Sequence, residues 1–340
     1  LDSWFAIRTA SHSLPRDHHK WFDQVIAKSA EASLQPSILA GYYKQLRSDQ
    51  AVERKKGRMG LESAGPTGLA YLLNNALSDS IPITSGMAEA LRSFGESGVE
   101  AWRVAMTTKN PSYRQRLLGL VTSDLTRSFT SELLSILYSE SDSPESKRLA
   151  RELLQAELNT IPGHEDSLGY MSRKLTRQLD SYLAMRTKDS GPPLSKEIWY
   201  WKDASLLESK MTEDGSADFE RCRQLAIGLT QLASLSQQDS VHAIAVLLES
   251  DFRETRSLLR EDPIGGLEGR VPRSIASNPN FMAKAFEVAR KYELLGAQVR
   301  AIQQMSLASR MSEVSAVTLG CWTQGLDSGQ PAIRFAVAEA

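Results

Sequence analysis

The segments LESAGPTGL (61–69) and LRSFGESGV (91–99) lie thirty positions apart and read almost as copies of each other. The copies share both glycines and continue into matching apolar positions: Gly65 with Gly95, Gly68 with Gly98, Leu72 with Trp102, and Ala76 with Met106. Self-similarity at such a period is typical of stacked helical hairpins, in which each unit buries its apolar face against the next. The repeat therefore predicts an architecture with an extended binding surface, and it names no ligand.

Apolar residues recur at helical spacing along nearly the whole chain, and strand-like alternation is almost absent. Each apolar stripe covers one helix face, which must pack against a neighbour. Prolines stand where first helical turns are expected to begin, at Pro66, Pro111, Pro144 and Pro331. Short helices joined by tight turns predict an all-α fold, an α-solenoid of stacked antiparallel helical hairpins.

A second recurring element follows the glycine element, in NPSYRQRLLGL (110–120), SPESKRLAREL (143–153) and QPAIRFAVAEA (330–340). Each copy has a proline and, three positions later, a basic residue: Arg114, Lys147 or Arg334. We expect these cations to pair with a carboxylate or with helix-end carbonyls of the neighbouring unit, which would join adjacent units. The alternative is a row of cations that binds an acidic partner.

Residues 90–121 together resemble a HEAT-type repeat of the bacterial, phycobilisome-lyase-like kind. The resemblance covers about 61–158 and returns at Pro331, although Asn110, Ser143 and Gln330 replace the acidic residue that this family has before the proline. Residues 219–249 are more similar to tetratricopeptide (TPR) hairpins, without that repeat's complete signature. The resemblance implies a helical array with TPR-like hairpins possible in the second half.

Four regions are expected along the chain. An N-terminal helical segment (1–60) precedes HEAT-like repeats (61–187), a linker with a helical hairpin (188–270) and further helical repeats (271–340). The breaks are TKDSGPPLS (187–195), whose Gly-Pro-Pro cannot continue a helix, and 262–280, which we expect to be a long loop. Because the chain begins at Leu1 and stops within a helical pattern, we expect it to be a piece of a longer protein.

The amino-acid composition excludes few classes of protein and gives no indication of a strongly charged partner. The 340 residues include 40 Lys and Arg against 41 Asp and Glu, a net charge of −1, which makes nucleic acid an unfavoured partner. No apolar run approaches the roughly 18–20 residues of a membrane-spanning helix. The two cysteines predict neither a disulfide framework nor a thiolate metal site, and no cofactor is expected. The cellular compartment stays open.

Histidines and glycines give no recognisable catalytic or metal motif. His12, His18 and His19 cluster near the start, where His18 or His19 could hold a metal with Asp17 or Asp23, but we expect a solvated helix start. His164 is expected in a polar loop before a helix, and His242 as a partly buried structural residue. The glycine-rich stretch 265–270 lacks the ending of a phosphate-binding loop, so we expect a flexible connection.

The aromatic run Ile198-Trp199-Tyr200-Trp201-Lys202 is the most unusual local composition in the chain. On a helix, three consecutive aromatics spread over an arc of roughly 200°, so at least one should reach a surface or groove. We expect them to fill the junction after the Pro-Pro linker. The alternative is an aromatic anchor for a partner peptide or a sugar, since buried Trp and Tyr dominate binding hot spots.

The sequence therefore predicts a non-catalytic interaction scaffold that binds a partner protein or peptide on a concave face. Its candidate contact residues are Trp199, Tyr200, Trp201, Arg114, Lys147 and Arg334. Two alternatives stay open. One is a DNA-binding protein that uses the basic stretch 44–58. The other is an enzyme similar to the HEAT-like alkylpurine DNA glycosylases, with Trp102 and Arg103 in a suitable repeat.

Overall fold

Helices dominate the computed structural model, so the predicted all-α class is confirmed. The structure describes residues 34–78, 85–108, 110–121, 123–187, 195–202, 206–232, 237–255, 262–267, 271, 273–309 and 314–340. His12, His18 and His19 lie outside these residues, as does most of the Pro-Pro linker. Within them, no helix combines the length and the apolar character needed to cross a bilayer.

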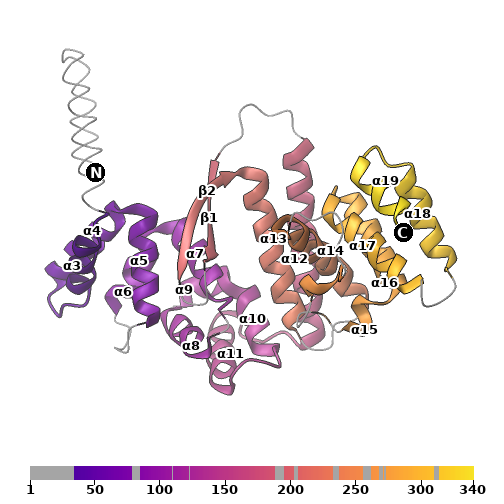
Figure 1. Ribbon diagram of the computed structural model, residues 1–340. Coiled ribbons are helices and arrows are strands. Elements are labelled where there is room, and N and C mark those ends of the chain that lie inside the picture. Colours follow the sequence, from indigo (N-terminus) through magenta and orange to yellow (C-terminus); the bar gives the residue numbers. More distant parts are fainter. Residues whose placement is uncertain are drawn as a thin grey trace, which may run out of the picture. The chain divides into compact units, whose positions relative to one another are not determined.

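The chain divides into two compact units, which Figure 1 shows with their elements labelled. Unit 1 comprises residues 1–128 and 197–211, and unit 2 comprises 129–196 and 212–340. The helices of unit 1 are α3 (Pro36–Leu46), α4 (Ala51–Ser63), α5 (Gly65–Ser78), α6 (Ser85–Ser93), α7 (Gly95–Ala105), α8 (Pro111–Leu120) and α9 (Ser123–Thr126). The 3₁₀ turn η2 (Arg127–Phe129) joins the two units in sequence.

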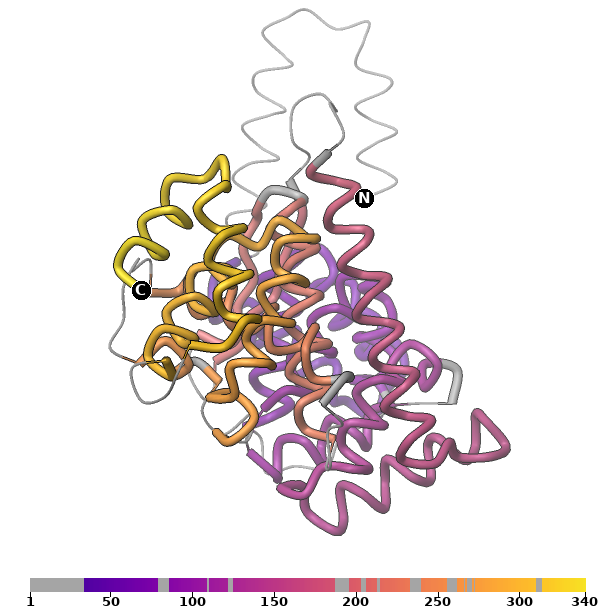
Figure 2. Tube along the Cα trace, turned by 90° about the vertical axis from the view of Figure 1, so that its right-hand side faces the viewer, coloured from indigo at the N-terminus to yellow at the C-terminus, as the bar shows by residue number. Residues whose placement is uncertain are grey.

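In the residues described, unit 2 consists of helices and their connections, with an isolated bridge between Ser139 and Leu232 and the ends of the two strands. Its helices are α10 (Thr130–Tyr138), α11 (Pro144–Leu158), α12 (His164–Thr187), α13 (Asp214–Gln231), α14 (Gln237–Thr255), α15 (Arg273–Ala276), α16 (Pro279–Lys291), α17 (Leu295–Ser309), α18 (Ala316–Leu326) and α19 (Pro331–Ala338), with the 3₁₀ turn η3 (Gly265–Leu267). The trace of α12, which has 24 residues, can be followed in Figure 2.

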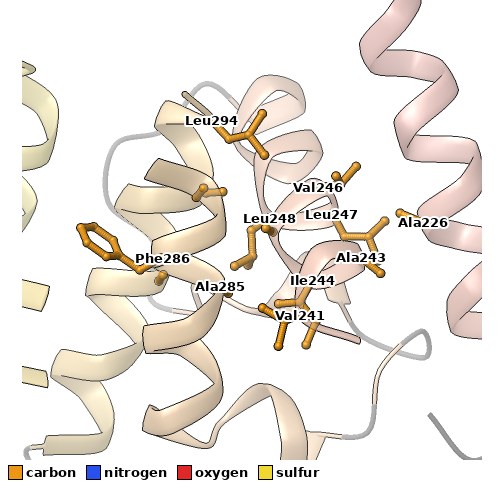
Figure 3. Close-up of a cluster of buried hydrophobic side chains, with 14 of the residues drawn as sticks. Ala226, Val241, Ala243, Ile244, Val246, Leu247, Leu248, Ala285, Phe286 and Leu294 are labelled. Atoms are coloured by element: carbon orange, nitrogen blue, oxygen red, sulfur yellow. The ribbon is translucent and has the colours of Figure 1, made fainter. Parts of the chain in front are cut away.

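The core of unit 2 forms around α14 and α17. Every residue of α14 from 243 to 248 is buried, and α17 is buried from 296 to 306, as expected for helices surrounded by other helices. Figure 3 shows side chains of α14, among them Ile244 and Leu248, together with Phe286 of α16 and Leu294. α14, α16 and α17 thus build one continuous apolar interior.

The two glycine elements have equivalent local structures, which confirms the predicted local repeat. Gly65 and Gly95 have φ values of +57° and +59°, so each sits in the left-handed region at a sharp corner between two helices. A Cβ on Gly68 would meet the carbonyl oxygen of Leu61, and one on Gly98 would meet that of Leu91. Both glycines therefore let consecutive helices approach closely.

The matching apolar positions of the two elements are also equivalent. Leu72 and Trp102 are both buried, and so are Ala76 and Met106. The helices of the first element, α4 and α5, pack on each other, as do α6 and α7, and α5 packs on α7. The thirty-residue period therefore corresponds to two helix pairs that pack in the same way.

Two expectations about local structure are wrong. The aromatic run lies on a β-strand and not on a helix: β1 (Ser195–Trp201) pairs with β2 (Leu207–Glu213) in a two-stranded sheet. Ile, Trp and Tyr favour strands, and a strand places alternate residues on opposite faces. The expected loop at 262–280 contains η3, α15 and the start of α16 among its described residues, because its Pro and Gly residues punctuate short helical turns.

Candidate functional site

The hairpin of β1 and β2 has one face turned inward and one turned outward. The Lys202 N–H donates to the Leu206 carbonyl at 2.9 Å, beside the ends of the two strands. Trp199 and Leu207, at 2% and 0% exposure, lie on the inner face with Glu197 and Trp201. Figure 1 shows the strands beside α7, and this inner face is the one held by helices of unit 1.

Helix α5 holds the hairpin through the backbone of β2. The Asn74 amide donates to the Leu207 carbonyl at 2.9 Å, and its oxygen accepts the Leu207 N–H, also at 2.9 Å. One side chain thus satisfies both backbone groups of an edge residue, as a neighbouring strand would. Because the contact uses only backbone atoms of β2, it selects an extended conformation and not a particular side chain.

Helix α7 holds the hairpin by two side chains of β1. The Ser97 hydroxyl donates to Glu197 Oε2 at 2.5 Å, and the Trp201 indole N–H donates to the Val104 carbonyl at 3.0 Å. Val104 lies in the last turn of α7, and its carbonyl also accepts from the N–H and the hydroxyl of Thr107. Asn74 and Val104 are thirty positions apart, so equivalent positions of the two repeats contact one hairpin.

The outer face carries a small polar and aromatic cluster. The Tyr200 hydroxyl donates to Glu208 Oε2 at 3.1 Å, and Lys202 Nζ lies 2.8 Å from Glu208 Oε1. The Lys210 ammonium sits 5.2 Å from the centre of the Tyr200 ring. The hydrogen bond to Glu208 raises the pKa of Tyr200 above its ordinary value. Of the three adjacent aromatics, Tyr200 is thus the one on the outward side.

Two polar atoms on the inner face are buried without a hydrogen-bond partner among the described residues. They are the indole Nε1 of Trp199 and the Oε1 oxygen of Glu197. An unpaired buried donor or acceptor costs about 1–3 kcal/mol, because it loses its hydrogen bonds to water. The hairpin is therefore held less tightly than its buried area alone suggests.

Two of the three recurring basic residues, Arg114 and Arg334, donate to backbone carbonyls a few positions earlier in the chain. Arg114 Nε donates to the Met106 carbonyl at the end of α7 at 3.3 Å, and its terminal nitrogen donates to Thr108. Arg334 makes the corresponding bond to the carbonyl of Ser328, six positions earlier, at 2.7 Å. Lys147 is half-buried on α11. Arg114 belongs to unit 1, whereas Lys147 and Arg334 belong to unit 2.

Several cations of the basic stretch 44–58 also contact other residues of this chain. Arg54 donates to the carbonyls of Ser48 and Asp49, at 3.1 and 2.7 Å. Lys56 pairs with Glu53, Arg58 pairs with Glu62, and Arg47 lies over the Tyr43 ring. Three of the region's cations therefore already have acidic or carbonyl partners.

The remaining candidate residues are placed apart from the hairpin. His164 packs edge-on against Tyr138 and begins α12, and His242 packs against Tyr292. Gly265 belongs to η3, and residues 268–270 lie outside the described part. Trp102 is buried, and Arg103 bonds Glu100 and the Ser128 carbonyl. Burial raises the pKa of Cys222 to about 12 and that of Cys321 to about 11.

The residues that hold the hairpin were not predicted from the sequence. Asn74 and Ser97 contact partners 133 and 100 positions away, and no local pattern encodes such a pairing. A weak signal did exist for the strand itself, since LESKMTE (207–213) has charged residues at 208 and 210 between Leu207, Ser209 and Met211. No three His, Cys, Asp or Glu of the described residues gather as metal ligands.

Comparison with known proteins does not assign the chain to a class. No family model matches it, and neither curated proteins nor solved structures give a significant match. The function must therefore be argued from the geometry of the hairpin and its two helices.

Proposed function

We propose that this protein is a non-catalytic interaction scaffold, built as a HEAT-like array, whose α5 and α7 helices bind another polypeptide. The observation that carries this proposal is the hairpin contact. Equivalent positions of two tandem helix pairs, Asn74 and Val104, hold an extended segment by its backbone and by an indole N–H. Main-chain hydrogen bonds give such a surface affinity for extended segments in general.

Repetition explains why such a surface can be extended. Each unit of a tandem array contacts chiefly its neighbours, so corresponding side chains recur along one face. Arg114 and Arg116 of α8 support this role, because they donate to the carbonyls of Met106 and Ala76, which are equivalent ends of α7 and α5. These bonds fix the two helix ends that frame the proposed face, which we name the α5/α7 face.

The test first captures a binding partner and then maps the residues of the chain that it protects. The immobilised full chain is exposed to a lysate of its source, and an enriched protein is purified and mixed with the free chain. The amide hydrogen exchange of the chain is then compared with and without this protein. We expect slower exchange in residues 65–78 and 95–105 of the chain. Either no enrichment above bare matrix, or protection confined to unit 2, would contradict the proposal.

A further inference from the structure

The inner face of the hairpin indicates which segments the α5/α7 face accepts. Its β1 strand presents an acidic residue and two aromatic residues at alternate positions, Glu197, Trp199 and Trp201. The three side chains have different contacts. Ser97 donates to the Glu197 carboxylate, Trp199 is buried, and the Val104 carbonyl accepts from the Trp201 indole. The strand period of two places all three side chains on one side.

The hairpin is a replaceable occupant because part of its inner face is poorly paired. Trp199 is 2% exposed, yet its indole N–H has no acceptor among the described residues, and Glu197 Oε1 also lacks a donor. These two missing hydrogen bonds lower the net stability of the hairpin's contact, so a second segment with the same residue pattern can compete for the face. The hairpin has the advantage of being tethered, which gives it a high effective concentration.

We propose that the α5/α7 face is a binding site for an extended partner segment that carries an acidic residue and two aromatic residues at alternate positions. The chain's own hairpin occupies this site until such a segment replaces it. This inference rests on the proposed function and adds the chemistry of the partner and a competition within the chain. Weakening the hairpin in the chain must therefore tighten the binding of a segment supplied from outside.

The experiment measures binding of a fluorescent peptide with the sequence of residues 195–213 to the full-length chain. Trp201→Phe removes the indole N–H that bonds Val104 but keeps an aromatic ring and leaves the α5/α7 face unchanged. The matched control is Tyr200→Phe, which alters the adjacent aromatic on the outer face. We expect about fivefold tighter peptide binding to the Trp201→Phe chain than to the wild type, the change that one lost hydrogen bond produces.

A stronger variant and a control peptide complete the test. Trp201→Ala, which also removes the aromatic ring, should tighten binding at least tenfold, provided that circular dichroism shows native helicity. The Tyr200→Phe chain loses a hydrogen bond within the hairpin and none to α5 or α7, so it should bind the peptide less tightly than the Trp201→Phe chain. A peptide with both tryptophans replaced by alanine should bind none of the chains. Equal affinity of all chains, including no binding to any, overturns the inference. The capture experiment can still succeed in that case, so the two failures are distinguishable.

Discussion

At the residue scale, the left-handed backbone at Gly65 and Gly95 explains why glycine recurs at the thirty-residue period. A side chain in this conformation costs roughly 1–2 kcal/mol. Apart from the chain neighbours and the nearby backbone of the same helix, no atom of the described residues lies within 4 Å of the Cβ position at either glycine, so we expect backbone strain to set this cost. We expect Gly65→Ala and Gly95→Ala to lower the free energy of unfolding by about 1–2 kcal/mol each, measured by urea titration.

The second glycine of each element should be at least as sensitive, for a steric reason. A Cβ on Gly68 or Gly98 would lie 2.1 or 2.4 Å from a backbone carbonyl oxygen of the preceding helix, which forces the two helices apart. We expect a loss of about 1–3 kcal/mol. The control is Gly119→Ala at an exposed position of helix α8, which should stabilise by about 0.5–1 kcal/mol. Similar losses of unfolding free energy at Gly68, Gly98 and Gly119 would contradict the close approach of the helices at the first two.

The stability of unit 2 should depend on pH through His242. Burial, together with the ammonium of Lys291, lowers the pKa of His242 below 6.5, while Asp180 opposes this shift. Because the folded state favours the neutral imidazole, the lowered pKa of His242 contributes its full stabilisation to the fold above pH 6.5. This stabilisation is lost as the pH falls below that value. We expect His242→Gln to lose less stability than the wild type between pH 7 and pH 5, measured as urea midpoints. Parallel curves would contradict this.

At the element scale, a buried ion pair joins α14 and α17. Arg300, at 0% exposure, donates to Asp251 at 3.1 Å and to Gln303 and Thr255, and its guanidinium lies near the Phe252 ring. Removing one partner leaves an uncompensated buried charge. We expect Arg300→Met to cost about 3–5 kcal/mol in unfolding free energy, measured by chemical denaturation.

Two further variants separate this ion pair from general effects of losing an arginine. The double variant Arg300→Met with Asp251→Leu should recover most of the loss, because a buried ion pair can be replaced by apolar side chains at little cost. Arg290→Met removes an exposed pair with Glu287 and should cost less than about 1 kcal/mol. A double variant as unstable as Arg300→Met would show that the pair itself is not responsible.

Sequence reasoning succeeded for elements whose signals are local. The helical periodicity and the equivalent settings of Gly65 and Gly95 follow from side-chain spacing and backbone conformation. The hairpin was missed because three adjacent aromatics satisfy both a helix and a strand pattern, so periodicity alone could not decide. The contacts of Asn74 and Ser97 depend on which distant segment folds against them, and the sequence pattern does not contain that information.

At the scale of the whole molecule, the two compact units should respond to different substitutions. The Gly68 and Asn74 positions belong to unit 1, and Arg300 and His242 belong to unit 2. Two-state unfolding is not expected of a chain with two cores. We expect calorimetry to resolve two transitions, with Gly68→Ala lowering one midpoint and Arg300→Met lowering the other. Equal shifts of a single transition by both variants would contradict this division.

The contact between the hairpin and α7 is the basis of the proposed function, and a double-mutant cycle measures it directly. Ser97 and Glu197 are separated by 100 positions in sequence and meet at 2.5 Å. Unfolding free energies are compared for the wild type, Ser97→Ala, Glu197→Ala and the double variant. We predict a coupling of about 1 kcal/mol, the typical net contribution of an intramolecular hydrogen bond. Additive effects within about 0.3 kcal/mol would show that the hairpin does not rest on α7, and would contradict the account.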